Sequence, residues 1–69
     1  MRYVIEYLRE STDEDSVCHT VNLESACLDD AGIAAFDGAP PLRASHGVNG
    51  FQIRDTTGAI VALETLDLA

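Results

Sequence analysis

The sequence contains no lysine and no tryptophan, and its only basic side chains are four arginines against 12 acidic residues. Its formal net charge is -8. A protein that binds nucleic acid needs clustered lysine and arginine to neutralise phosphates, and these four arginines are scattered along the chain. The same shortage of positive charge argues against attachment to an anionic membrane surface. We therefore expect neither nucleic acid nor membrane as a partner.

Long apolar runs are also missing. No stretch approaches the ~20 apolar residues that a membrane-spanning helix needs. Glu6 follows Met1 too closely for a signal peptide's apolar core to fit between them. These two absences lead us to expect a cytoplasmic protein.

Cysteine is scarce, with Cys18 and Cys27 as the only two. One bridge closing one loop would not make a disulfide scaffold. Both residues stand among apolar neighbours, where a free cysteine behaves as a small hydrophobic residue. We expect both to be reduced and to lie in the core.

What the chain does have is a globular composition, with 46% hydrophobic and 23% charged residues. Its 69 residues are enough for one core. We therefore expect a single domain over residues 1–69.

The first third of the chain reads as a β-hairpin. Residues 2–9 are rich in β-branched and aromatic side chains, which favour a strand. Residues 10–16 have no apolar side chain and are typical of a solvated loop. Residues 17–21 predict a second, short strand, with His19 on the same face as its two valines.

A helix is predicted over residues 23–37, with Asn22 as its N-cap. Its apolar side chains fall within one broad arc, whereas Ile33 and Phe36 lie outside that arc. Gly38 suits the left-handed position that ends a helix, and the following Pro40 and Pro41 should prevent continuation. Residues 39–50 are then expected to form a crossing loop.

A second hairpin is predicted near the end of the chain. Residues 51–54 and 59–63 are the strands, and the Asp-Thr-Thr-Gly turn at 55–58 joins them. The tail, residues 64–69, either extends the last strand or frays. The expected fold class is α+β: a small antiparallel sheet of about four strands, in the order β-β-α-β-β, with one helix on one face. The expected core is Tyr3 or Val4, Ile5, Val21, Leu23, Cys27, Ala31, Ala34, Ile53, Val61 and Leu63.

The chain has more apolar surface than one helix can cover. Residues 59–63 are apolar on both faces, and such strands are usually covered on both sides. A single helix covers only one face, and Ile33 with Phe36 adds apolar surface outside its buried arc. These patterns predict a homodimer or another protein partner, with Ile33, Phe36, Ile60 and Ala62 as interface residues.

Candidate chemistry is sparse. A metal site could draw on Cys18, His19, Cys27 and His46, but neighbouring strand residues face opposite ways and the tight spacing of zinc ligands is absent. Residues 13–15 are acidic without the glycine and glutamate of a calcium loop, and Ser45 next to His46 has no glycines of a nucleophile elbow. We expect no catalytic residues, no metal and no cofactor.

Three features carry a resemblance to a known kind of domain. Arg2 and Tyr3 open the first strand, an alanine-rich stretch covers residues 26–35, and an Asp-x-x-Gly turn joins the last two strands. In this order the chain resembles small uncharacterised bacterial domains over most of its length. Those domains have no established activity, so the resemblance implies only the fold. The first strand, hairpin and helix are also similar to the HicB antitoxin's partial ribonuclease-like domain.

Three functional hypotheses follow. The first is a small non-catalytic protein that associates with itself or with another protein. The second is an acidic antitoxin-like or inhibitory module that binds a basic protein, because an acidic field attracts cationic molecules. The third is a small-ligand or metal site formed between subunits.

Overall fold

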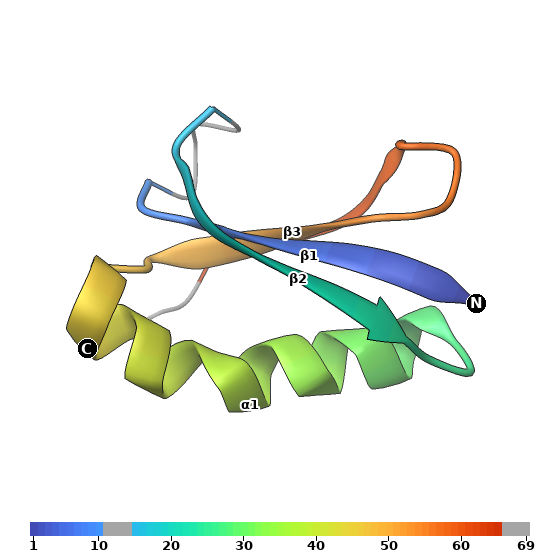
Figure 1. Ribbon diagram of the computed structural model, residues 1–69, viewed down its shortest axis with the longest axis horizontal. Coiled ribbons are helices and arrows are strands. Elements are labelled where there is room, and N and C mark those ends of the chain that lie inside the picture. The colour runs from blue at the N-terminus through green and yellow to red at the C-terminus, as the bar shows by residue number, and fades with distance from the viewer. Residues whose placement is uncertain (11–14, 66–69) are drawn as a thin grey trace.

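A computed structural model of the chain describes residues 1–10 and 15–65 (Figure 1). Within these residues, four strands form one antiparallel sheet and one helix lies across one of its faces. The predicted α+β fold with the order β-β-α-β-β is confirmed. The elements are β1 (Arg2–Leu8), β2 (Val17–Glu24), α1 (Leu28–His46), β3 (Gly50–Arg54) and β4 (Ile60–Thr65). In the sheet the strands lie in the order β2-β1-β3-β4.

Alternation along the strands and a four-residue spacing along the helix build the core. In β1 every second residue from Tyr3 to Tyr7 is buried, and small side chains recur every fourth position on the buried side of α1. Small residues allow the helix to approach the sheet closely. The buried cluster is Tyr3, Ile5, Tyr7, Ala31, Ala35, Ala39, Val48, Phe51 and Ile53.

Strand β2 is longer than predicted, and the helix begins later. Arg2 is paired with Glu24 and Val4 with Asn22, so β1 has a strand partner along its whole length. Asn22 is therefore a strand residue, and its prediction as N-cap is wrong. The N-cap is Cys27, whose backbone is extended with φ -154° and which has no side-chain cap hydrogen bond. Residues 22–24 therefore pair with β1, although Asn22 by itself favours the start of a helix.

The predicted end of the helix is also wrong, as is the predicted loop over 39–50. Helix α1 contains Gly38, Pro40 and Pro41 and continues to His46. The two prolines have no N–H group, so two carbonyls one turn earlier lose their helical donors. The helix ends at Gly47, whose φ is 70° and whose N–H donates to the Arg43 carbonyl.

The β3–β4 hairpin is confirmed. One carboxylate oxygen of Asp55 accepts hydrogen bonds from the backbone N–H of Thr57 (2.9 Å) and of Ala59 (3.2 Å) and from the Thr57 hydroxyl (2.5 Å). Gly58 has a φ of 85°, which glycine adopts readily. The hydrogen bond from the Thr57 hydroxyl is the main cause that lowers the pKa of Asp55 below its ordinary value.

The predicted core is correct only in part. Tyr3, Ile5, Ala31 and Ile53 are buried, whereas Val21, Leu23 and Ala34 are half-buried. Three predicted members, Cys27, Val61 and Leu63, are exposed. Cys27 is exposed because it caps the helix, and the other two belong to an edge strand. Buried residues that the sequence did not predict are Tyr7, Leu8, Ala35, Ala39, Val48, Phe51 and Gln52.

Two predictions fall partly on residues 11–14 and 66–69, which lie outside the described residues. These are the acidic loop at 10–16 and the tail at 64–69, of which Glu64 and Thr65 extend β4. Within the described residues, no helix is long and apolar enough to cross a membrane.

Candidate functional site

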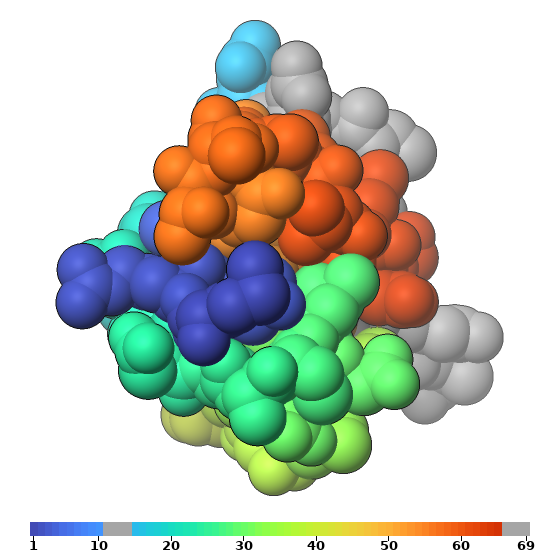
Figure 2. Space-filling view, turned by 90° about the vertical axis from the view of Figure 1, so that its right-hand side faces the viewer, coloured from blue at the N-terminus to red at the C-terminus, as the bar shows by residue number. Residues whose placement is uncertain are grey.

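Large exposed apolar side chains gather on two elements, α1 and β4. On the helix, Ile33 is 60% exposed and Phe36 is 48% exposed. On the strand, Leu63 is 57%, Ile60 is 39% and Val61 is 38% exposed. Figure 2 shows the start of α1 (green) and β4 (orange-red) side by side on one face of the molecule. Five of the six large hydrophobic side chains that are exposed in the described part of the chain therefore belong to these two elements.

Strand β4 is one of the two edges of the sheet, and β3 is its neighbour in the sheet. β4 stands at the margin of the helix layer and its side chains are largely exposed, so this apolar strand is the surface that the single helix leaves uncovered. The other edge, β2, differs in chemistry: its exposed side chains are Thr20, Asn22 and Glu24. Natural edge strands are commonly protected by polar and charged side chains. Every exposed side chain of β2 is polar, whereas β4 has exposed polar side chains only at its end, Glu64 and Thr65, after three exposed apolar ones.

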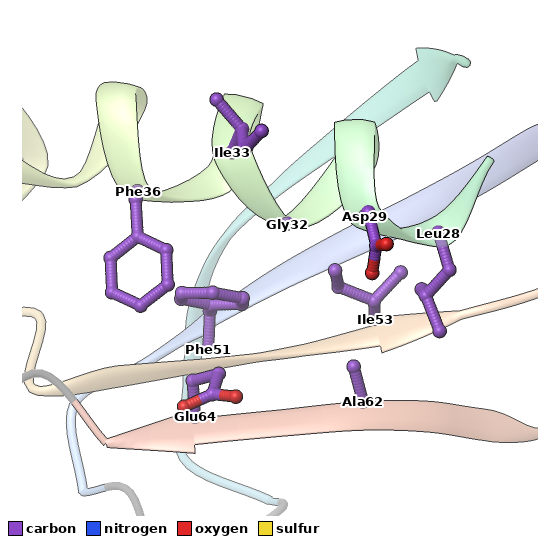
Figure 3. A pocket seen from close by; sticks show the side chains of 9 residues that line it. All are labelled: Leu28, Asp29, Gly32, Ile33, Phe36, Phe51, Ile53, Ala62 and Glu64. Atoms are coloured by element: carbon purple, nitrogen blue, oxygen red, sulfur yellow. The ribbon is translucent and has the colours of Figure 1, made fainter. Parts of the chain in front are cut away.

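Between α1 and β4 lies a hollow of about 470 Å³, which we name the α1–β4 groove (Figure 3). It exists because the helix packs mainly on β2, β1 and β3 and leaves the β4 side of the same face open. The groove is lined by Leu28, Asp29, Gly32, Ile33 and Phe36 of α1, Phe51 and Ile53 of β3, and Ala62 and Glu64 of β4.

Phe36 and Phe51 form one wall of the groove. Their ring centroids are 5.1 Å apart and their planes are at 90°, an edge-to-face contact that aromatic pairs favour. Phe51 is fully buried, whereas about half of Phe36 faces solvent. Phe36 therefore covers the core with one side of its ring and offers apolar surface with the other.

The charged side chains that line the groove are both acidic. Asp29 points into it from the helix and Glu64 approaches from β4 (Figure 3). The four arginines all lie outside the groove lining. Arg2 Nε lies 3.7 Å from Glu24 Oε2, and Arg9 Nε donates a hydrogen bond to the His46 carbonyl at the end of α1. The groove thus combines an apolar floor with two carboxylates.

The sheet face opposite the helix has a polar centre. Arg54 Nε and Gln52 Nε2 both donate to Glu6 Oε1, at 2.6 Å and 2.8 Å, and Gln52 is only 1% exposed. Burial of Glu6 by itself raises the pKa of its carboxyl group, but these hydrogen bonds and the charge of Arg54 outweigh burial and lower that pKa below its ordinary value. The exposed apolar side chains Ile60 and Leu63 lie at the β4 margin of this face, because they pair with Arg54 and Gln52.

The structure brings three of the four predicted interface residues together. Ile33, Phe36 and Ala62 all line the groove. Ile60 is paired with Arg54, past a register shift in β3–β4 pairing, and so lies toward the opposite face. Asp29 and Glu64 were missed. Strand alternation could have placed Glu64 on the same face as Ala62. Nothing local in the sequence indicated that the start of the helix, with Asp29, lies above that face.

The candidate metal and catalytic residues do not converge. The rings of His19 and His46 lie 5.6 Å apart, whereas Cys27 is at the opposite end of α1 and Cys18 Sγ points at the Tyr7 carbonyl. Ser45 Oγ lies 2.7 Å from His46 Nδ1 and donates to a carbonyl one turn earlier in the helix. Within residues 1–10 and 15–65, no three His, Cys, Asp or Glu side chains are grouped so that they could hold a metal ion. Both cysteines have free thiols.

No family model, curated protein or solved structure matches the chain. The resemblance to small bacterial domains and to the HicB antitoxin therefore stays a prediction from the sequence.

Proposed function

We propose that this is a non-catalytic protein that acts by association, and that β4 is the edge at which it pairs with a second copy. The observation that carries the proposal is the contrast between the two edges of the sheet. Strand β2 exposes only polar side chains, whereas β4 exposes Ile60, Val61 and Leu63 besides Glu64 and Thr65. An open, apolar strand edge is a template for pairing with another strand.

Pairing of β4 with its copy fits the geometry of a symmetric dimer. Two antiparallel edge strands related by a two-fold axis perpendicular to the sheet present the same surface to each other. Two four-stranded sheets would then join into one of eight strands, with both helices on the same side. The exposed apolar side chains of β4 in one copy would lie beside those of the other copy and be removed from contact with water.

The energetics favour association only if side chains contribute as well as the backbone. A stable interface buries roughly 800 Å² on each partner, about a fifth of the 4146 Å² that this chain exposes. Full burial of a valine, leucine or isoleucine contributes about 1.5–3 kcal/mol. These gains oppose the loss of translational and rotational freedom and the mutual repulsion of two chains that each carry -8.

Light scattering coupled to gel filtration tests the proposal. The wild-type chain should have twice its 7.4 kDa mass. The double variant Val61→Lys/Leu63→Lys should be monomeric, although it reduces the net negative charge and hence the repulsion. The matched control, Thr20→Lys/Asn22→Lys, makes the same charge change on the β2 edge and should stay dimeric. A monomeric wild-type chain at every concentration tested, or a dimer that survives the β4 substitutions, would contradict the proposal.

A further inference from the structure

We infer that the α1–β4 groove binds a cationic, amphipathic segment of another protein. An apolar side chain of that segment lies on the floor made by Ile53 and Ala62, and its arginine or lysine side chains meet Asp29 and Glu64. This site lies on a face of the sheet, whereas the proposed self-association uses the β4 edge. The two surfaces can therefore be occupied and tested separately.

The shape and lining of the groove fit part of a protein segment. Its volume of about 470 Å³ is within the usual size of binding pockets, and most of its lining is apolar. Leu28 stands toward one end and the Phe36–Phe51 pair at the other, with Ile53 between them on the floor (Figure 3). A side chain such as leucine would replace water over this floor while its neighbours reach the rim.

The charge of the lining selects the class of partner. Asp29 and Glu64 are carboxylates on opposite walls, and within the described part of the chain neither has an ion-pair partner. Residues of the same sign on both walls disfavour an acidic occupant and favour a basic one. The surrounding field of a chain with net charge -8 attracts the same partner from a distance.

Two other occupants fit less well. A second copy of this chain would bring no lysine, and Arg54, one of its four arginines, is already held by Glu6. The chain's own residues 66–69 would add Asp67, a third carboxylate, to the two that are present. With only four arginines and a net charge of -8, a second copy supplies less complementary charge than a basic protein does.

The test uses full-length protein and a blocked synthetic peptide in which leucine alternates with arginine. Fluorescence anisotropy of the labelled peptide should show saturable binding, whereas a peptide with glutamine in place of arginine should bind much more weakly. Because exposed ion pairs contribute little individually, removing each carboxylate should weaken binding about two- to five-fold. The double variant Asp29→Asn/Glu64→Gln should therefore bind roughly 4- to 25-fold more weakly.

The matched control separates the groove from the general acidity of the protein. Asp30→Asn/Asp37→Asn removes the same charge from two exposed helix positions outside the groove lining, and should change affinity less than about two-fold. Equal weakening in the two double variants, or no binding by the wild type, would overturn the inference. Ala62→Phe, which fills the floor, should also abolish binding, and unchanged binding by that variant would likewise overturn it.

The same peptide titration separates this inference from the proposed self-association. The Val61→Lys/Leu63→Lys variant should be monomeric and still bind the peptide, because neither substitution lies in the groove lining. If the wild type is monomeric and binds the peptide, only the proposed self-association is contradicted. If the wild type is dimeric and does not bind the peptide, only the proposed groove ligand is contradicted.

Discussion

The hydroxyl of Tyr7 fills the space that a Cβ atom on Gly38 would need. A Cβ built at Gly38 would lie 2.7 Å from Tyr7 Oη, closer than Cβ atoms in real proteins approach a neighbouring heavy atom. The hydroxyl donates a 2.7 Å hydrogen bond to the Ala35 carbonyl of the same helix, and burial raises the pKa of Tyr7, so the donor proton is kept at neutral pH. Gly38 therefore permits close contact between helix and sheet, and does not end the helix.

Substitution of Gly38 by alanine should destabilise the protein, although alanine normally favours a helix by about 1 kcal/mol. The added methyl group displaces the Tyr7 hydroxyl, and overpacking of this kind costs about 1–3 kcal/mol. The control is Gly32→Ala in the same helix, where a Cβ meets nothing within 4 Å and stability should rise by up to about 1 kcal/mol. Urea unfolding of both variants measures the difference, and equal effects at the two positions would contradict the account.

The loss in the Gly38→Ala variant should depend on the tyrosine hydroxyl. Tyr7→Phe alone should lower the free energy of unfolding by about 0.5–1.5 kcal/mol, because one buried hydrogen bond is lost. In the phenylalanine background the alanine meets no hydroxyl, so Gly38→Ala should become nearly neutral or stabilising. A double-mutant cycle gives the coupling energy directly. Additive effects of the two substitutions would show that the contact does not matter.

Acid should remove the stabilisation that comes from Glu6. Its pKa is lower in the folded protein than in the unfolded chain, so its contribution is fully present above the ordinary glutamate pKa and is lost as the pH falls through the folded value. Glu6→Gln should therefore destabilise the protein more at pH 7 than at pH 3. The control Glu10→Gln makes the same charge change at an exposed position. Urea unfolding at both pH values should show a pH-dependent effect only for Glu6.

Salt should act in opposite directions on the two proposed interactions. Self-association brings together two chains that each carry -8, so screening their repulsion should tighten the dimer. Binding of a basic peptide relies on attraction, so the same screening should weaken it. Sedimentation equilibrium and peptide titration over one series of sodium chloride concentrations measure both trends. A dimer that loosens with salt would show that ion pairs hold it, contrary to an apolar edge.

The sequence predicted elements whose signals are local and missed boundaries that depend on distant partners. The hairpin at residues 50–65 was predictable because Asp55 and Gly58 suit its turn directly. The predicted helix bounds were wrong at both ends. Asn22 suits an N-cap locally, but it pairs with β1, and Gly38 suits a helix end locally, but it lies inside the helix against Tyr7. Its true end depends on Gly47, beyond two prolines that usually stop a helix.

The candidate site was partly predictable for the same reason. Helical spacing alone places Ile33 and Phe36 off the buried arc, and both are exposed. Asp29 and Glu64 come from distant parts of the chain, and only the sheet order and the register of β4 bring them to one groove. The apolar run grouped Ile60 with Ala62, but the register shift that lies between these two residues directs Ile60 toward the opposite face of the sheet.

Hydrogen exchange at the amides of β4 tests the pairing of this edge most directly. In a strand that bonds only to β3, the N–H groups that face outward exchange rapidly. We predict that these outward amides of β4 are protected, that protection increases with protein concentration, and that the outward amides of β2 exchange rapidly under the same conditions. Equally rapid exchange at the outer edges of β4 and β2, at all concentrations, would contradict the account.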